Sequence, residues 1–130
     1  MGDIINNIVV MTRGDTFTFD LTIYDDSESD GRYKLKGNDA LYLGIMDPGQ
    51  PFEVALVRKK FTVDNCDAMG NLVICLEPED TIDLCPGTYY YAIKLKMDHE
   101  FIDPITNEPT GEYVNDVTTI VNKTKFFIID

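Results

Sequence analysis

The chain has 130 residues, 44% of them hydrophobic, which suits one domain with a buried core and leaves no room for a second. Its formal net charge is −12, from 23 acidic and 11 basic side chains, so its surface should repel nucleic acid and anionic membranes. No apolar run approaches the roughly 20 residues that a bilayer span needs, and no basic leader precedes an apolar stretch near Met1. We expect one soluble domain over residues 1–130, without a secretory signal and without nucleic-acid or membrane partners.

Residues suited to catalysis or metal binding are sparse. The cysteines Cys66, Cys75 and Cys85 form no C-x-x-C pair, and His99 is the one histidine that could assist them. Their odd number favours reduced thiols over a disulfide framework. Both serines lie in an acidic segment, and no glycine-rich phosphate loop occurs. We therefore predict no catalytic, cofactor-binding or metal-binding residues, no cofactor, and no enzymatic activity.

Apolar and polar residues alternate along much of the chain, as they do in half-buried antiparallel strands. Residues 4–10 are apolar enough for an edge strand. The clearest alternation, over 88–97, predicts a central strand. The last strand is rich in β-branched and aromatic residues and should be bulged or broken near Asn122. The predicted strands are 4–10, 16–24, 41–46, 52–57, 72–76, 88–97, 117–121 and 125–129.

One short helical turn is predicted over residues 78–84, where Pro78 and the acids after it suit a helix start and Pro86-Gly87 ends it. No segment of a dozen residues has helical periodicity. About seven short strands and this turn predict an all-β fold, an immunoglobulin-like antiparallel β-sandwich, with a closed barrel as the alternative. In the sandwich, the hydroxyl of Tyr89 or Tyr91 would bond to nearby backbone and form a tyrosine corner.

The first of two unusual connections, residues 25–31, places acids at alternate positions before Gly31, as the opening of a calcium loop does. A twelve-residue loop counted from Asp26 would need a glutamate where Gly37 stands. A solvated hairpin turn at Asp30-Gly31 is therefore favoured, and calcium binding stays open.

The second connection, predicted over 98–116, carries prolines, a glycine and several acids. Long loops in compact domains are often contact surfaces; the alternative is a hairpin extension. Apolar groups in an acidic loop tend to mark interfaces, although Phe101 and Tyr113 could instead cover the domain's own core. The candidate interface residues are Phe101, Ile102, Ile105 and Tyr113, followed by Ile4, Ile5, Ile8 and Val9.

Four short motifs mark the ends or interiors of predicted strands. They read R-G-D-T at 13–16, P-E-D-T at 78–81, L-C-P-G-T-Y at 84–89 and V-T-T-I-V at 117–121. With these motifs the chain resembles the amino-terminal domain of phage baseplate upper proteins and related immunoglobulin-like domains of phage tail proteins. The similarity spans most of the chain. Family members usually continue into receptor-binding or trimeric parts, so a stand-alone component and a part of a longer protein both stay open.

The resemblance implies a non-enzymatic structural protein of a bacteriophage tail or baseplate, made in the bacterial host cytoplasm and located in the virion. Copies would assemble around the tail axis as a homo-oligomer and contact other tail or baseplate proteins through strand edges and the long loop. The alternative is a carbohydrate-binding or surface-adhesion module of β-sandwich fold, in which Tyr24, Tyr33, Tyr42 or Tyr113 would stack on sugars. A hydrolase that uses a pair of acids ranks third.

Overall fold

The protein, described from a computed structural model, is built mostly of β-strands, as the sequence predicts. The structure describes residues 3–5, 7–24, 31–67, 71–103, 105–106 and 108–130, with the backbone alone for 3–5 and 102. The strands are β1 (Asp3–Ile5), β2 (Ile8–Thr12), β3 (Phe17–Leu21), β4 (Ile23–Tyr24), β5 (Arg32–Tyr33), β6 (Ala40–Met46), β7 (Val57–Phe61), β8 (Leu72–Leu76), β9 (Gly87–Ile102) and β10 (Pro109–Ile129). The short helices are the 3₁₀ turns η1 (Phe52–Val54) and η2 (Val63–Asn65) and the α-helical turn α1 (Pro78–Thr81).

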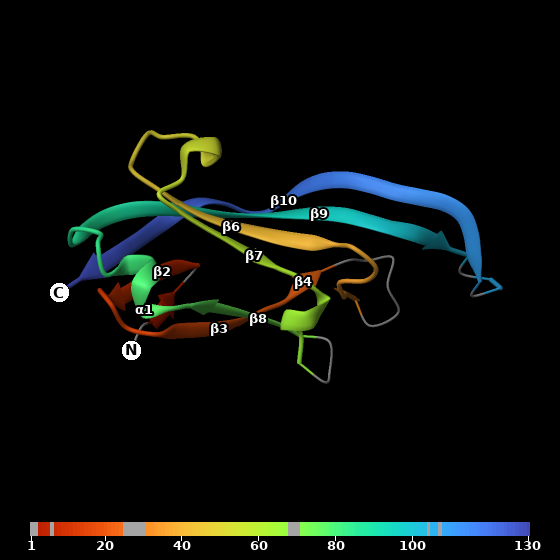
Figure 1. Ribbon diagram of the computed structural model, residues 1–130, viewed down its shortest axis with the longest axis horizontal. Helices are drawn as coiled ribbons and strands as arrows, with labels where there is room; N and C mark the ends of the chain where they lie inside the picture. The colour runs from red at the N-terminus through yellow and green to blue at the C-terminus, as the bar shows by residue number, and fades with distance from the viewer. Residues whose placement is uncertain (1–2, 6, 25–30, 68–70, 104, 107) are drawn as a thin grey trace.

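The strands form two facing layers (Figure 1). The larger layer is a six-stranded sheet in the order β1-β2-β10-β9-β6-β7, the second is the pair β3-β8, and β4-β5 is a separate short pair. All pairings are antiparallel except that of β2 with β10, where Phe126 lies opposite Val9. The sequence prediction of a wholly antiparallel fold is wrong at this pair. The chain leaves β2 for β3 in the other layer, so no hairpin sets the direction of β2 against β10.

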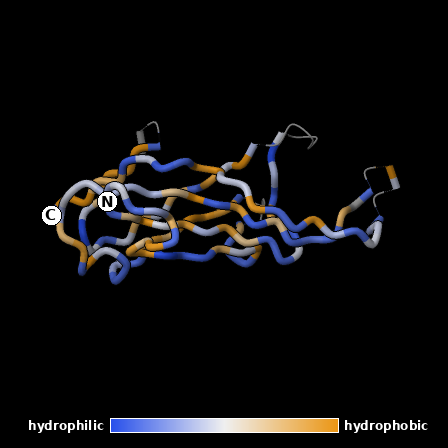
Figure 2. The backbone as a smooth tube through the Cα atoms, turned by 90° about the horizontal axis from the view of Figure 1, so that it is seen from above, coloured by the Kyte–Doolittle hydropathy of each residue, from blue (hydrophilic) through white to orange (hydrophobic). Residues whose placement is uncertain are grey.

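The core lies between the two layers. Strand β9 is paired on both sides, and its predicted central position is confirmed. Its inward residues Ile93 and Leu95 belong to one buried cluster with Leu43 of β6 and Ile74 of β8. Alternation of inward and outward side chains thus fixes the register of each strand, because a slip by one residue would turn the apolar face to solvent. Figure 2 shows the molecule from above, where the pair β9 and β10 extends beyond the other strands.

The predicted strand over residues 52–57 is wrong. Phe52 opens the turn η1, Val54 and Leu56 are half exposed, and strand β7 begins only at Val57. The ring of Phe52 packs on Gly44 of β6, where a Cβ would lie 2.8 Å from the ring atom Cε2. This contact folds the segment back over the sheet instead of letting it continue as a strand.

The predicted long loop over 98–116 is also wrong, and the alternative of a hairpin extension is correct. Strands β9 and β10 continue through it, with a register shift between Pro109 and Tyr113. Gly111 has φ of +84° at this shift, a value that glycine adopts without strain. The predicted bulge near Asn122 is confirmed by register shifts on both sides of Val121. The acidic segment 25–30, with its hairpin and calcium alternatives, lies outside the described residues.

The hydroxyl-to-backbone hydrogen bond that a tyrosine corner requires is present at the start of β9. The hydroxyl of Tyr89 donates a hydrogen bond to the carbonyl oxygen of Cys85 at 2.6 Å, across the turn that follows α1. The hydroxyl of Tyr91 donates to the carbonyl oxygen of Asn7, which ties the β1–β2 turn to the sheet. Burial raises the pKa of both phenols, so both remain donors at neutral pH.

Tyr89→Phe should lower the free energy of unfolding by about 1 kcal/mol, the usual net value of one hydrogen bond. Urea unfolding followed by circular dichroism measures this change. Tyr24→Phe is the matched control, because Tyr24 is 83% exposed. Equal stabilities of the two variants would show that the hydroxyl of Tyr89 contributes nothing.

Candidate interaction surface

Beyond the end of β6, strands β9 and β10 form a two-stranded arm, defined here as residues 97–117 (Figure 1). Strand β6 accompanies β9 only as far as Lys96, which lies opposite Ala40, and the carbonyl oxygen of Asp98 accepts one further bond from the amide of Asn38. Strand β2 accompanies β10 only over Phe126–Ile129. Among the described strands, therefore, the arm has no partner other than its own two halves, and its outer edges are open for backbone pairing.

The arm carries large apolar side chains in solvent. Tyr113 is 72% exposed, Val117 61%, Phe101 44%, and Ile105 near the tip 92%. Tyr113 lies opposite Glu100, so Tyr113 and Phe101 occupy opposite faces of the ribbon. Exposed apolar groups gathered on one projecting element are typical of an interaction surface.

Six of the eight predicted interface residues lie on the arm or in β1. Phe101, Ile105 and Tyr113 are exposed on the arm and do not cover the domain's own core, so that alternative is wrong. The side chains of Ile4, Ile5 and Ile102 lie outside the described residues.

Residues 8 and 9 divide between the two faces of β2. Ile8 is half-buried, and Val9 is fully buried, so the prediction that Val9 makes external contacts is wrong. Val9 and Met11 share the inward face of β2, because successive residues of a strand point to opposite sides. Val117 was missed by the sequence prediction because the V-T-T-I-V motif resembled a strand of the core.

A buried carboxylate fastens the arm to the sheet at its base. Asp39 is 1% exposed, and its oxygens accept hydrogen bonds from the hydroxyl of Tyr33 (2.5 Å) and the amides of Asp98 (2.7 Å) and Lys36 (3.2 Å). His99 Nδ1 lies 2.8 Å from the same carboxylate. Burial raises the pKa of Asp39, but these hydrogen bonds outweigh burial, and the pKa lies below its usual value of 3.8. The carboxylate therefore stays ionised at neutral pH and holds the first residues of the arm.

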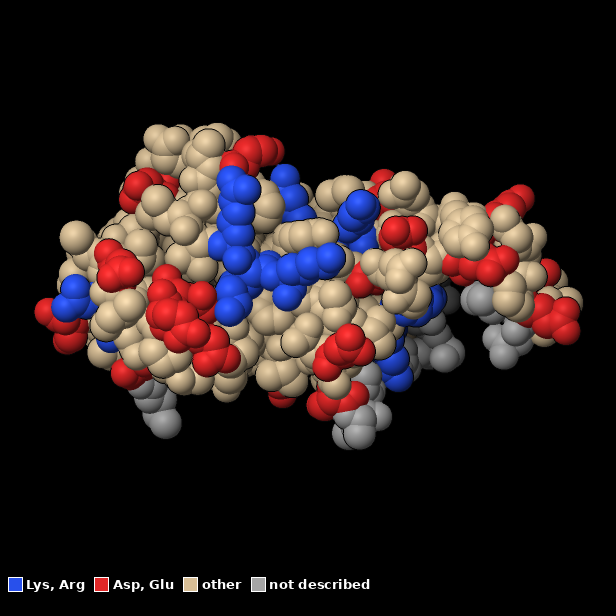
Figure 3. All heavy atoms as spheres, viewed as in Figure 1, with Lys and Arg blue, Asp and Glu red and all other residues tan. Residues whose placement is uncertain are grey.

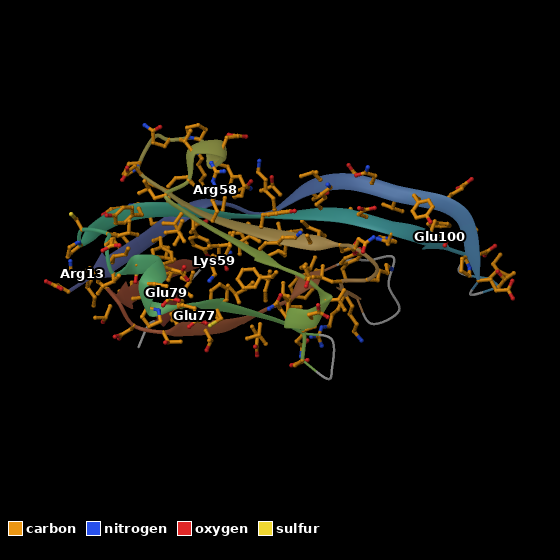
Figure 4. All side chains as sticks on the ribbon, viewed as in Figure 1. Arg13, Arg58, Lys59, Glu77, Glu79 and Glu100 are labelled. Carbon is orange, nitrogen blue, oxygen red and sulfur yellow. The ribbon has the colours of Figure 1, made fainter. Side chains whose placement is uncertain are left out.

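One edge of the large sheet, formed by β7, is protected against strand pairing. Edge strand β7 carries consecutive charges at Arg58, Lys59 and Lys60. The ammonium of Lys59 lies 3.0 Å from the carboxylate of Asp80, which belongs to α1 (Figure 4). Charged side chains on an edge strand discourage edge-to-edge association. The geometry thus favours the arm, rather than β7, for contacts through backbone pairing.

Two further features of the described residues concern metal binding and membrane insertion. No group of three or more His, Cys, Asp or Glu side chains in this part of the chain is placed to hold a metal ion. No helix there has the length and apolar character needed to cross a bilayer. Comparison of the chain with family models, with curated proteins and with solved structures found no match.

Proposed function

We propose that this chain is a non-enzymatic structural module of a bacteriophage tail or baseplate, which uses its arm to bind copies of itself and neighbouring virion proteins. The observation that carries the proposal is the arm itself. It is a β-ribbon with open edges and exposed Phe101, Ile105, Tyr113 and Val117, held at its base by Asp39. Open edges offer backbone pairing and the apolar groups offer burial, which together drive strand-mediated assembly.

The strand order supports an immunoglobulin-like sandwich as the fold of this module. In variable-type immunoglobulin domains one sheet runs G-F-C-C′ and the other contains B and E. The corresponding order here is β10-β9-β6-β7, with β3 and β8 paired in the second layer. With β8 and β9 assigned as strands E and F, the helical turn α1 and the Tyr89–Cys85 hydrogen bond fall in the E–F connection, which supports this assignment.

The assignment to a phage tail rests on the motif resemblance. Two of its motifs touch in the structure: the amide of Gly14, in R-G-D-T, donates to the hydroxyl of Thr81, in P-E-D-T, at 2.9 Å. The motif at 84–89 contains both partners of the Tyr89–Cys85 hydrogen bond, and the motif at 117–121 lies within β10. The Gly14–Thr81 bond supports reading the first two motifs as parts of one structural unit. The role in the virion and the synthesis in the bacterial cytoplasm are proposed on the resemblance alone.

Light scattering after size-exclusion chromatography tests the role of the arm. The wild-type chain should elute at a multiple of its 14.7 kDa mass at high protein concentration. Ile105→Ser/Tyr113→Ser should be monomeric, because it removes the two most exposed apolar groups of the arm. Tyr24→Ser/Ile129→Ser, which removes exposed apolar groups elsewhere, should assemble like the wild type.

A wild-type chain that stays monomeric and retains no tail or baseplate protein in a pull-down would contradict the proposal. Saturable sugar binding by such a monomer, seen on a glycan array, would instead favour the carbohydrate-binding alternative.

A further inference from the structure

The outer face of the large sheet carries a basic, aromatic surface. Tyr42 of β6 lies between Lys60 of β7 and Lys94 of β9 in the register of the sheet. The ammonium of Lys60 is 6.0 Å from the centre of the Tyr42 ring, and that of Lys94 is 4.9 Å from the Phe52 ring. We call Tyr42, Phe52, Arg58, Lys60 and Lys94 the basic groove. All except Lys94 line one open hollow of about 450 Å³, and Leu43, Glu53 and Lys59 complete its lining.

The groove is formed by the β6–β7 connection, which folds back over the sheet. Phe52 sits on Gly44, and the guanidinium of Arg58 donates to the carbonyl oxygen of Glu53. The ammonium of Lys123, from β10, donates to the carbonyl oxygen of Gln50 at 2.7 Å. Contacts at both ends of the connection therefore hold the Phe52 ring in place before any partner binds.

The cations of the groove have no acidic partner in the described part of the chain. No ion pair joins Arg58, Lys60 or Lys94 to a carboxylate there, whereas neighbouring Lys59 is paired with Asp80. Figure 3 shows basic side chains gathered on the face where β7 runs, and Figure 4 places Arg58 beside the η1 connection. In a chain of net charge −12, this concentration of positive charge selects an anionic partner.

The arm has the complementary composition. It contains no lysine or arginine, and its acids are Asp98, Glu100, Asp103, Glu108, Glu112 and Asp116. None of these forms an ion pair within the described residues. Glu100 and Asp103 each accept a backbone bond, from Gly111 and Ile105, which shapes the end of the arm. The arm thus presents carboxylates beside exposed Tyr113 and Ile105, and the groove offers ammonium groups beside aromatic rings.

The arm of the same copy does not lie over this groove. The groove includes Lys94 of β9, and the arm continues from Lys96 away from η1 along the long axis (Figure 1). An arm bound in the groove would therefore come from another copy. Contact between two different surfaces is heterologous, so repeating it builds a closed ring or an open chain of copies.

We propose that the acidic arm of one copy docks in the basic groove of a second copy, which makes self-assembly head to tail. This inference rests on the proposed function, since it names the partner surface of the arm. Carboxylates of the arm meet Lys60 and Lys94, and Tyr113 packs against the Tyr42 and Phe52 rings. Each copy then uses one arm and one groove.

Native mass spectrometry of mixed variants tests this arrangement. The groove variant is Lys60→Glu/Lys94→Glu, and the arm variant is Glu112→Gln/Tyr113→Ser. Each alone should weaken self-association at least about tenfold and appear monomeric, because charged contacts of this kind contribute that much or more. Mixed in equal amounts, they should form a one-to-one heterodimer and nothing larger, since only one intact arm and one intact groove can meet.

Two matched controls carry similar changes elsewhere. Lys34→Glu/Lys125→Glu controls for reversed charge, and Asp20→Asn/Tyr24→Ser controls for the loss of an acid and an aromatic ring; both should assemble like the wild type. Thermal unfolding at the wild-type midpoint verifies that each variant is folded.

The outcomes separate this inference from the proposed function. A groove variant that assembles like the wild type, or a mixture without the heterodimer, overturns docking in the groove. In that case an arm variant that is monomeric leaves the proposed function standing. A wild-type chain that is monomeric at every concentration overturns both.

Discussion

Asp39→Ala should lower the free energy of unfolding by about 3–5 kcal/mol, because removal of one partner from a buried charged network leaves the others without a bond. The groups left behind are the hydroxyl of Tyr33, the ring of His99 and the amides of Asp98 and Lys36. Urea unfolding at neutral pH measures the loss. Asp20→Ala, which truncates an exposed aspartate on β3, is the control and should change stability little. Equal losses for the two variants would contradict the role given to Asp39.

The contribution of Asp39 also has a defined pH dependence. Its pKa is lower in the folded chain than the ordinary 3.8, so the folded state binds its proton less readily than the unfolded state. The stabilisation is complete above the unfolded pKa and is lost as pH falls through the lower folded pKa. Wild-type stability should therefore fall on acidification below about pH 4, and Asp39→Asn should show a shallower fall. Identical pH profiles would show that another carboxylate dominates.

Thr81→Val should cost about 1–3 kcal/mol, the penalty for a buried donor without an acceptor. Thr81 is fully buried, and its hydroxyl accepts the amide of Gly14, so valine keeps the shape but leaves that amide unbonded. Thr81→Ser retains the hydroxyl and is the matched control. The difference in unfolding free energy between the two variants, measured in urea, isolates the bond. A valine variant as stable as the serine variant would mean that the two motifs are not joined through this hydroxyl.

Elements with strict alternation and clear turn residues were predictable from the sequence. Strands β3, β8 and β9, the helical turn at Pro78 and the tyrosine corner at Tyr89 all follow from local patterns. Each depends on contacts between residues that are near in sequence or on a simple inside–outside period. The bulge beside Val121 was predictable for the same reason.

The errors arose where distant contacts override a local pattern. Residues 52–57 alternate like a strand, but Phe52 packs on Gly44, eight positions earlier, and forms part of the groove instead. Pro109 and Gly111 suggested a loop, yet proline is tolerated on an unpaired edge and glycine at a bulge, so the ribbon continues through both.

The candidate surfaces were predictable only in part. The apolar residues of the arm stood out because acids surround them in the sequence, which is why Phe101, Ile105 and Tyr113 were identified. The groove was not predicted, because Tyr42, Lys60 and Lys94 come from three strands that become neighbours only in the folded sheet. Asp39 was missed as well, since nothing in its local sequence marks it as buried.

Hydrogen exchange at low and high protein concentration tests most directly whether the arm is the contact surface. In residues 99–102 and 109–117, the backbone amides that point away from the paired strand of the arm have no strand partner within the copy. These amides should exchange quickly in dilute solution. They should gain protection when copies assemble, whereas amides of β3 and β8 should exchange alike at both concentrations. Unchanged exchange in the arm at a concentration where the chain has assembled would contradict the account.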